Sequence, residues 1–288
     1  MNGVINLYKE KGITSFGAVA AVRRMLKVKK VGHTGTLDPE AEGVLPICVG
    51  KATKLVDYIM NGDKSYRAGF QLGRISDTLD AFGTVEATGV ELPSEDEVRE
   101  KLKAFLGLTM QRPPMYSALK INGKRLYDLA REGIEVHRDV RPITVHSISL
   151  ENFDGEFGEL FIRCSKGTYI RSIIDDLGAE LGCGAIMTSL VREGTGTFNM
   201  ENSVTLGTLE SEGHEKYLIP MDQVLEAYEA MTVPEDFYKL IVNGLKIKDR
   251  RLTDLFAPGL YRGYSHKGEL LGILEREEDF LHLKVNLM

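Results

Sequence analysis

Disulfide and metal-binding patterns are missing from this sequence. Its 288 residues include three cysteines, Cys48, Cys164 and Cys183, which are widely spaced and form no C-x-x-C pair. We expect reduced, mostly buried thiols, because a disulfide framework or a zinc site needs closely patterned cysteines. The six histidines form no H-E-x-x-H or H-x-H pattern. Any chemistry is therefore predicted to work without a tightly bound transition metal.

Long apolar runs and a leader pattern are missing too. No stretch approaches the roughly 20 apolar residues of a membrane span. The N-terminus, MNGVINLYKEKG, lacks a basic segment followed by an apolar one, which a secretory signal would have. The composition, 43% apolar and 27% charged, is typical of a folded soluble protein. We expect a cytoplasmic protein.

An overall positive charge is also lacking, since the formal net charge is −6. This balance argues against nonspecific binding to polyanions. Any one basic cluster is typical of a solvated face, but several of them on an acidic chain leave a local nucleic-acid surface open. The three clusters are Arg23, Arg24, Lys27, Lys29 and Lys30; Lys120, Lys124, Arg125, Arg131, Arg138 and Arg141; and Lys246, Lys248, Arg250 and Arg251.

Helical and strand-like patterns are mixed along the chain without a β–α–β rhythm, which predicts an α+β main domain. Apolar spacing predicts helices over 14–27, 52–60 and 172–181, and alternation predicts strands over 44–50, 64–73, 143–150 and 159–164. The first helix has Thr14 or Ser15 as its N-cap and Phe16 among its apolar positions. Ser94 and Glu97 form a capping box that opens a further helix. That helix is expected to bury Val98, Leu102, Phe105 and Leu106.

Two segments stand apart from this pattern. Residues 109–140 contain a double proline, an Asn122-Gly123 hairpin signal and a basic surplus, which predict a protruding, mobile element. The pattern restarts near 231–234, followed by a helix ending at Asn243-Gly244 and several short strands. Residues 231–288 are therefore expected to form a small β-rich module.

The stretch GHTGTLDPEAEGVLP, residues 32–46, has an unusual composition. Asp38 before a proline is ordinary in a turn. Three surrounding glycines, Gly32, Gly35 and Gly43, permit backbone conformations closed to other residues, or a close approach of another chain. Together with His33 they make Asp38 a candidate catalytic carboxylate. His33 by itself is typical of a surface or core histidine, but beside Asp38 it becomes a candidate nucleic-acid contact.

Three further side chains remain ambiguous from spacing alone. Arg171, at the start of a helix in CSKGTYIRSIIDDLG, is either solvated or the partner that holds a carboxylate ionised and oriented. Tyr66 occupies a strand position where an aromatic is usually core, but it could instead stack on an unpaired base, a contact worth roughly 1–3 kcal/mol. Leu190 has the same ambiguity between core and pocket.

Four separated stretches together resemble the bacterial TruB family of tRNA pseudouridine synthases. They occur in order, with matching spacing, over most of the first 230 residues: GHTGTLDP…GVLPICVGKATK, DKSYRAGFQLGRISDTLDAFG, RPPMYSALKINGKRLYDLAREG and CSKGTYIRSIIDDLGAELGCGA. The tail resembles a PUA-type RNA-binding module far more weakly. The resemblance implies a pseudouridine synthase catalytic domain over 1–230, with a central mixed, largely antiparallel sheet flanked by helices. It also implies that 109–140 is a protruding RNA-contacting segment and that 231–288 is a small PUA-like RNA-binding domain.

The resemblance also implies an activity. The uridine at position 55, in the T-loop of tRNA, is flipped out and isomerised to pseudouridine by an aspartate nucleophile that attacks either the base or the sugar C1′. The enzyme is expected to be a monomer that acts on tRNA without a cofactor, metal, protein partner or membrane.

The resemblance assigns roles to individual residues as well. Asp38 matches the catalytic aspartate, Arg171 its partner and Tyr66 the aromatic that stacks on the flipped base. The remaining matches are substrate-binding: His33, Tyr169 and Leu190 line the target pocket, and Lys9 is the basic residue of the N-terminal motif.

Two departures from the family pattern and three rival functions accompany these expectations. Glu10 follows Lys9 where the family usually has proline, and Glu42, where threonine is common, is expected to point away from Asp38. One rival is a guide-RNA-dependent relative with the same core. Another is a tRNA-binding or tRNA-folding module in which catalysis is secondary. A glycoside hydrolase would need two carboxylates with distinct roles, and only Asp38 has a motif around it.

Overall fold

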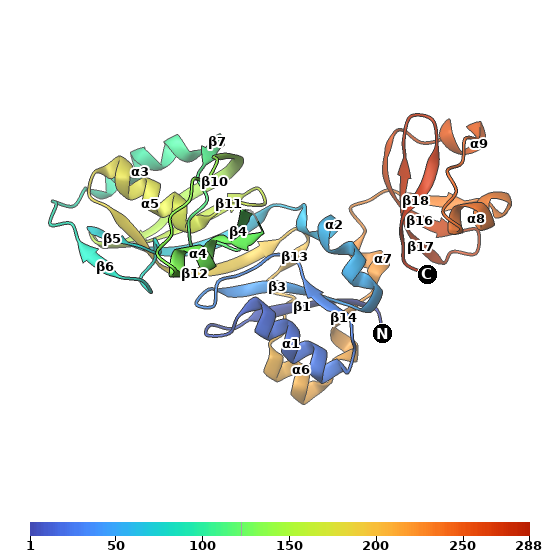
Figure 1. The fold of residues 1–288 in the computed structure, drawn as a ribbon, viewed down its shortest axis with the longest axis horizontal. Coiled ribbons are helices and arrows are strands. Elements are labelled where there is room, and N and C mark those ends of the chain that lie inside the picture. Colours follow the sequence, from blue (N-terminus) through green and yellow to red (C-terminus); the bar gives the residue numbers. More distant parts are fainter. Residues whose placement is uncertain (122) are drawn as a thin grey trace.

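The computed structural model describes residues 1–121 and 123–288, and within them a ten-stranded sheet runs through the main body (Figure 1). Its order is β14–β1–β3–β12–β4–β11–β10–β7, with β2 beside β3 and β13 beside β12. Strands β3 and β12 pair in parallel, whereas the other neighbouring pairs described are antiparallel. The predicted α+β fold with a mixed, largely antiparallel sheet is confirmed.

The strands of this sheet have the following bounds: β1 Gly3–Lys9, β2 Val31–His33, β3 Glu42–Val49, β4 Lys64–Leu72, β7 Gly107–Gln111, β10 Arg141–Phe153, β11 Phe157–Cys164, β12 Ala185–Thr195, β13 Phe198–Asn199 and β14 Leu218–Ile219. The expected strands over 64–73, 143–150 and 159–164 correspond to β4, β10 and β11.

Helices from distant parts of the chain cover one face of the sheet in a single apolar core. They are α1 (Ser15–Leu26), α3 (Glu95–Leu102), α5 (Ile170–Leu181) and α6 (Leu206–Glu212). Thr14 is the N-cap of α1, since its side chain accepts a hydrogen bond from the Gly17 amide at 2.8 Å. Phe16 does not join the core, and its 69% exposure shows that the buried stripe of α1 runs instead through Ala18, Val19 and Val22.

The capping box of α3 forms as predicted, with Ser94 and Glu97 bonded reciprocally. Val98 and Leu102 are buried. The expected burial of Leu106 is wrong, because the helix ends at Leu102 and a short 3-10 turn, Lys103–Phe105, redirects the chain. Leu106 therefore lies 48% exposed just before the edge strand β7.

Residues 109–140 contain a small hairpin and a helix in front of the sheet, drawn in green in Figure 1. Strands β8 (Lys120–Ile121) and β9 (Lys124–Arg125) pair antiparallel, and α4 (Leu126–Arg131) follows. Asn122, the expected turn residue, lies outside the described residues. A second hairpin, β5 (Arg74–Ser76) and β6 (Val85–Ala87), extends beyond the end of β4.

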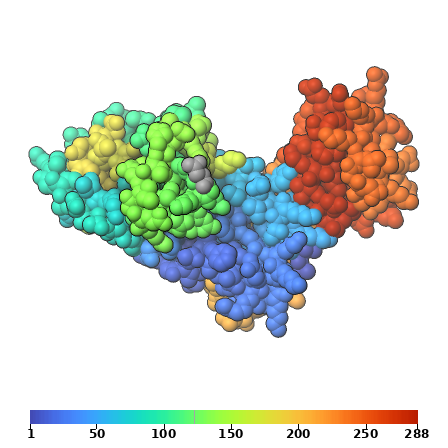
Figure 2. All heavy atoms as spheres, in the orientation of Figure 1, coloured from blue at the N-terminus to red at the C-terminus, as the bar shows by residue number. Residues whose placement is uncertain are grey.

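The C-terminal part of the chain forms a separate lobe at the far end of the molecule (Figures 1 and 2). Its four-stranded sheet has the order β15–β16–β17–β18, with bounds Ala230–Val233, Gly259–Ser265, Leu270–Arg276 and Leu281–Asn286. Two helices accompany it, α8 (Glu235–Val242) and α9 (Arg250–Thr253). Ile273 and Leu287 join an apolar cluster with residues of η1 (Gly50–Leu55), α2 (Val56–Met60) and α7 (Met221–Val224) nearby, so this lobe packs against the main body.

The cysteines are buried and free, as expected for reduced thiols. Burial is the cause that raises the pKa of Cys48 to about 12 and, as the largest of several causes, that of Cys164 to about 11. Both thiols are therefore protonated near neutral pH.

Within residues 1–121 and 123–288, no helix is long and apolar enough to cross a membrane.

Candidate active site

Asp38 lies on the loop between β2 and β3, and its side chain is 42% exposed. The turn expected from the Asp-Pro step is present, since the Ala41 amide donates to the Asp38 carbonyl at 3.1 Å. Both neighbours of Asp38 are held by the N-terminal segment. Ser15 bonds to the backbone of Leu37, and the Gly12 amide donates to the Pro39 carbonyl at 2.9 Å.

Arg171, in the first turn of α5, pairs with Asp38 at 2.9 Å between Nη2 and Oδ2. The side chain of Arg171 is only 7% exposed, so the ion pair joins a buried guanidinium to a partly exposed carboxylate. The same guanidinium donates to the carbonyls of Thr78 at 3.0 Å and Tyr116 at 2.8 Å. The spacing in the sequence left open whether Arg171 is solvated or paired with a carboxylate, and the structure favours pairing. Arg171 thereby connects three segments of the chain, those of Asp38, Thr78 and Tyr116.

Tyr66 and Leu190 lie on the buried face of the sheet, on the neighbouring strands β4 and β12. In the antiparallel register Tyr66 is opposite Arg192, and Leu190 is opposite Ala68. Tyr66 is 6% exposed and Leu190 9%. Burial raises the pKa of Tyr66, the neighbouring Arg192 lowers it, and the charge of Asp38 raises it to a smaller extent.

Tyr169 lies immediately before α5 and is fixed by Gln111 at the end of β7. The Tyr169 amide donates to Gln111 Oε1 at 2.8 Å, and Gln111 Nε2 donates to the Tyr169 carbonyl at 3.0 Å. Burial raises the pKa of Tyr169, while contact with Ser117 lowers it and the charge of Asp38 raises it further. The base of the 109–140 segment therefore contacts the site through Ser117 and Tyr116.

His33 ends β2 on the same loop as Asp38. The pKa of His33 lies below its ordinary value, chiefly because of burial and then because of the nearby Arg192. Its Nδ1 atom is buried and has no hydrogen-bond partner within the described part of the chain. Arg192 and the backbone of Gly35 are the groups that act on this imidazole, and none of the described contacts joins it to Asp38.

Lys9 does not fit the substrate-binding role that the resemblance implied. It is fully buried, and its ammonium donates to the carbonyls of Glu10, Ile13 and Pro39 at 3.1, 2.7 and 3.1 Å. Three donors and three acceptors leave it nothing to offer a substrate. Lys9 instead ties the N-terminal loop to the residue that follows Asp38.

Asp80 is a site residue that sequence reasoning missed. Its Oδ2 lies 3.7 Å from Arg171 Nη1, and its Oδ1 accepts hydrogen bonds from the Thr78 hydroxyl at 2.6 Å and the Phe82 amide at 3.0 Å. Arg171 therefore lies between two carboxylates. The stretch RISDTLDAFG contained the signal, a second aspartate in a turn after a buried strand, but only folding brings it to Arg171.

Two glycines of the Asp38 loop adopt backbone conformations that other residues rarely adopt, as expected, but the close approach is to this chain and not to another one. Gly35 and Gly43 have φ of 101° and 109°, which favours glycine. A Cβ on Gly43 would lie 2.3 Å from the carbonyl oxygen of Arg192, so the close approach is to this chain's own β12.

Glu42 is directed to the Tyr8 hydroxyl. The pKa of Tyr8 rises to about 12, chiefly because of burial and then because of the Glu42 carboxylate.

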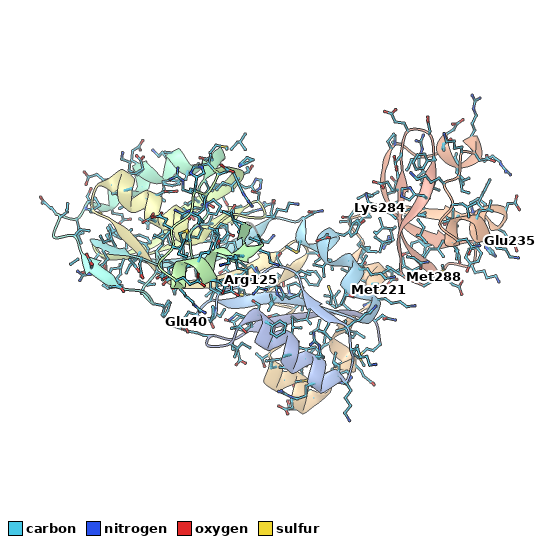
Figure 3. The ribbon with its side chains drawn as sticks, in the orientation of Figure 1. Glu40, Arg125, Met221, Glu235, Lys284 and Met288 are labelled. Atoms are coloured by element: carbon cyan, nitrogen blue, oxygen red, sulfur yellow. The ribbon has the colours of Figure 1, made fainter. Side chains whose placement is uncertain are left out.

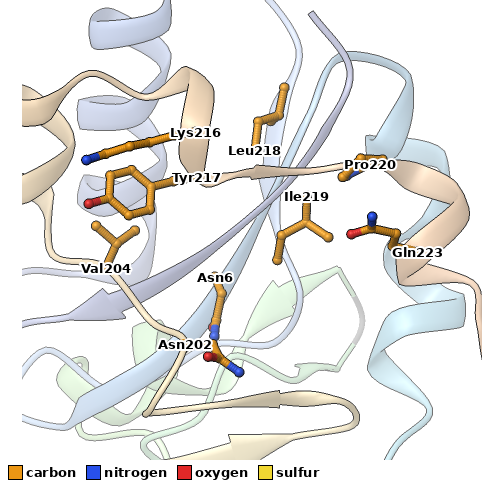
Figure 4. Close-up of a pocket in the computed structure, with 9 residues that line it drawn as sticks. All are labelled: Asn6, Asn202, Val204, Lys216, Tyr217, Leu218, Ile219, Pro220 and Gln223. Atoms are coloured by element: carbon orange, nitrogen blue, oxygen red, sulfur yellow. The ribbon is translucent and has the colours of Figure 1, made fainter.

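Two other features lie away from this site. A hollow of about 290 Å³ lies beside β14. Figure 4 shows residues that line it, among them Asn6, Tyr217 and Gln223, and Asp38 is not part of this lining. In the residues described, the one group of His and carboxylate side chains close enough to hold a metal is Glu275, Glu277 and His282. It belongs to the C-terminal lobe, and Lys284 already pairs with Glu275.

The mixed sheet that carries the paired Asp38 and Arg171 belongs to a pseudouridine synthase, an isomerase, as a matching family model shows. The comparisons with known proteins define the group more closely. A family model described as TruB family pseudouridylate synthase (N terminal domain) matches residues 23–170. A second, the tRNA pseudouridylate synthase B C-terminal domain, matches residues 171–231. The chain belongs to the TruB family.

Curated relatives agree with this membership, and solved structures share the fold. Proteins named tRNA pseudouridine synthase B are 49% identical in Clostridium perfringens, over 96% of both chains, and 46% identical in Clostridium acetobutylicum, over 97% of both. A solved Cbf5-Nop10-Gar1 complex contains a chain 26% identical, with a TM-score of 0.74, covering 99% of this chain and 85% of that one. A structure of an H/ACA RNP bound to a substrate RNA shares the fold at a TM-score of 0.72 and 24% identity, with coverage of 99% and 85%.

Proposed function

We propose that this protein converts the uridine at position 55, in the T-loop of tRNA, into pseudouridine. The observation that carries the proposal is the 2.9 Å pair between Asp38 and Arg171, which shares one site with Tyr66 and Tyr169. The relatives of 45–49% identity that are named tRNA pseudouridine synthase B support tRNA as the substrate.

The reaction is an isomerisation, so no atom is gained or lost. The bond between the sugar C1′ and N1 of uracil breaks, the base turns, and a bond forms between C1′ and C5. C5 loses a proton and N1 gains one. Asp38 is the proposed nucleophile, attacking either the base or the sugar C1′. Arg171 orients its carboxylate and supplies the opposite charge, since a planar guanidinium fixes a carboxylate in position.

Chemistry at a glycosidic bond requires the nucleotide to leave the stack, at a cost of a few kcal/mol. An irregular RNA loop lowers that cost because its bases are already partly unstacked. Tyr66 is proposed to stack on the flipped uracil. Since Tyr66 is 6% exposed, the base must enter the site to reach it. His33, Tyr169 and Leu190 are the proposed lining of that pocket.

The wider RNA contacts are proposed for two segments. Within 109–140, Arg125 and Arg131 lie 5.6 and 5.5 Å from the ring centre of Tyr127, which forms a basic and aromatic surface. Figure 3 labels Arg125 in front of the main body. We assign residues 1–230 to the catalytic domain and 231–288 to a small PUA-like RNA-binding domain. A cytoplasmic monomer that needs no protein partner remains a prediction.

The decisive experiment supplies the protein with an unmodified tRNA transcript and an isolated T-arm hairpin, and maps pseudouridine by chemical labelling. We expect modification at position 55 in both RNAs. A folded protein that binds the T-arm but modifies no uridine there would contradict the enzyme and favour a tRNA-folding role. Modification only in the presence of an added guide RNA would favour the guide-dependent alternative.

Asp38→Asn provides the matching variant. It keeps the size of the side chain and removes the charge, so turnover should disappear while T-arm affinity stays within roughly threefold, because the proposed role of Asp38 is chemical rather than structural. Comparable loss of binding and turnover would make Asp38 a structural residue.

A further inference from the structure

Phe82 lies on the rim of the candidate site with half of its side chain in solvent. Its exposure is 50%, and it follows Asp80 by two residues. Single exposed apolar side chains are common on protein surfaces and imply nothing by themselves. The way in which Phe82 is held sets it apart.

The turn that presents Phe82 is held by two hydrogen bonds from backbone amides, and it contains one residue in a strained conformation. The Phe82 amide donates to Asp80 Oδ1 at 3.0 Å, and the Ala81 amide donates to the Met187 carbonyl at 2.9 Å. Leu79 has a φ of 64°, a left-handed conformation that costs a residue with a Cβ roughly 1–2 kcal/mol. Such conformations persist where the surroundings enforce them, and they cluster at functional sites.

A cation from a second segment covers part of the ring. The Lys11 ammonium lies 5.1 Å from the ring centre of Phe82 and 3.7 Å from Glu40, which Figure 3 labels at the lower edge of the main body. Glu40 follows Asp38 by two residues. Glu40 offsets part of the Lys11 charge, so the surface offers an aromatic face rather than a strong phosphate site.

We propose that Phe82, held by Asp80 and Lys11, is a stacking platform for one unpaired nucleobase next to the target uridine. This inference rests on the proposed function, because it assumes an RNA loop at the site. The two aromatic residues have different proposed partners. Tyr66, which is buried, stacks on the target base, and Phe82, which is exposed, stacks on a neighbouring base. Extrusion of one nucleotide breaks the stack around it, and an aromatic face replaces part of that lost contact.

The test compares Phe82→Ala and Phe82→Tyr with the unaltered protein on an unmodified T-arm hairpin. Fluorescence anisotropy gives Kd, and initial rates give kcat and KM. Loss of a stacked base weakens binding by roughly 5- to 150-fold on alanine substitution, so Kd and KM should rise within that range for Phe82→Ala. Phe82→Tyr should restore binding, because it keeps the ring. Phe157→Ala is the control, since Phe157 is a phenylalanine of similar exposure, 46%, at the start of β11 after the turn from β10, where its amide donates to Asp154.

Abasic nucleotides placed at each position of the hairpin loop identify the partner base. At the loop position whose base stacks on Phe82, the effects on Kd of removing the base and of removing the ring should not be additive. Phe82→Ala should therefore not weaken binding of the hairpin that is abasic at this position any further. Unchanged affinity in Phe82→Ala, or full additivity at every loop position, would overturn the platform. These binding measurements are independent of turnover. A protein that binds the hairpin without isomerising uridine would contradict the proposed function and still test Phe82.

Discussion

Ser15 holds Leu37, the residue before Asp38, through both of its backbone polar groups. The Leu37 amide donates to Ser15 Oγ at 2.8 Å, and Oγ donates to the Leu37 carbonyl at 2.9 Å. Ser15 is 3% exposed, so water does not compete for these bonds. Lys9 and Gly12 hold the carbonyl of Pro39 on the other side. The backbone of Asp38 is thereby fixed on both flanks.

Ser15→Ala should therefore lower kcat more than it lowers binding. A misplaced catalytic group costs up to roughly 100-fold in rate, and we expect a loss of about 10- to 100-fold in kcat with KM little changed. Ser15→Thr keeps the hydroxyl and should recover much of the rate. Steady-state kinetics on the T-arm hairpin measures both parameters.

Thr14→Ala is the matched control for this prediction. It removes the N-cap of α1, which costs about 0.5–2 kcal/mol of stability, but leaves the bonds to Leu37 in place. If the two alanine variants lose the same rate at equal loss of stability, Ser15 acts only on the helix.

Asp80→Asn should reduce turnover by roughly tenfold or more, because a carboxamide holds Arg171 less strongly and Arg171 orients Asp38. Asp77→Asn changes the same hairpin without touching Arg171, since Asp77 accepts only from the Thr84 amide at 2.8 Å among the hydrogen bonds described. Its turnover should stay near the unaltered level. Equal losses in both variants would place the effect in the hairpin as a whole.

His33 should make the protein less stable as the pH falls. The pKa of His33 lies below its ordinary value of 6.5 because of burial and Arg192, so the unfolded chain binds the proton more readily. Above pH 6.5 His33 is mainly neutral in the folded and the unfolded state, so it does not weaken folding. Below pH 6.5 the unfolded chain binds a proton that the folded protein binds less readily, and the free energy of unfolding falls. Between about pH 7.5 and pH 5.5, the free energy of unfolding in urea should fall more for the unaltered protein than for His33→Gln. Parallel curves would contradict this assignment.

Gly43→Ala should be strongly destabilising, because the new Cβ would meet the Arg192 backbone at 2.3 Å in a residue with φ of 109°. Gly155→Ala separates the two causes, since Gly155 has a φ of 103° with nothing within 4 Å of its Cβ. Strain alone costs on the order of 1 kcal/mol, and the collision should add clearly to that. Thermal unfolding of both variants measures the difference, and equal shifts in Tm would leave strain as the whole effect.

The local elements followed from the sequence because their causes are local. Thr14 caps α1, Ser94 and Glu97 cap α3, and alternation along β4 buries Tyr66, Ala68, Phe70 and Leu72. The end of α3 was misjudged at Leu106, where a 3-10 turn outweighs apolar spacing. Phe16 was misjudged because spacing alone does not say which stripe of a helix meets the sheet.

The sequence by itself determined the α+β class, the capped helices and the suspicion attached to Asp38, since turn chemistry, capping and periodicity act between near neighbours. Only the tertiary structure decided which groups meet. Asp80 and Asp38 lie on different loops, and the guanidinium of Arg171, from a third segment, contacts both. The same folding buried Lys9 among backbone carbonyls and turned it from a substrate contact into a support. Burial and long-range contact depend on the packing of the whole chain, and spacing along the sequence does not encode them separately.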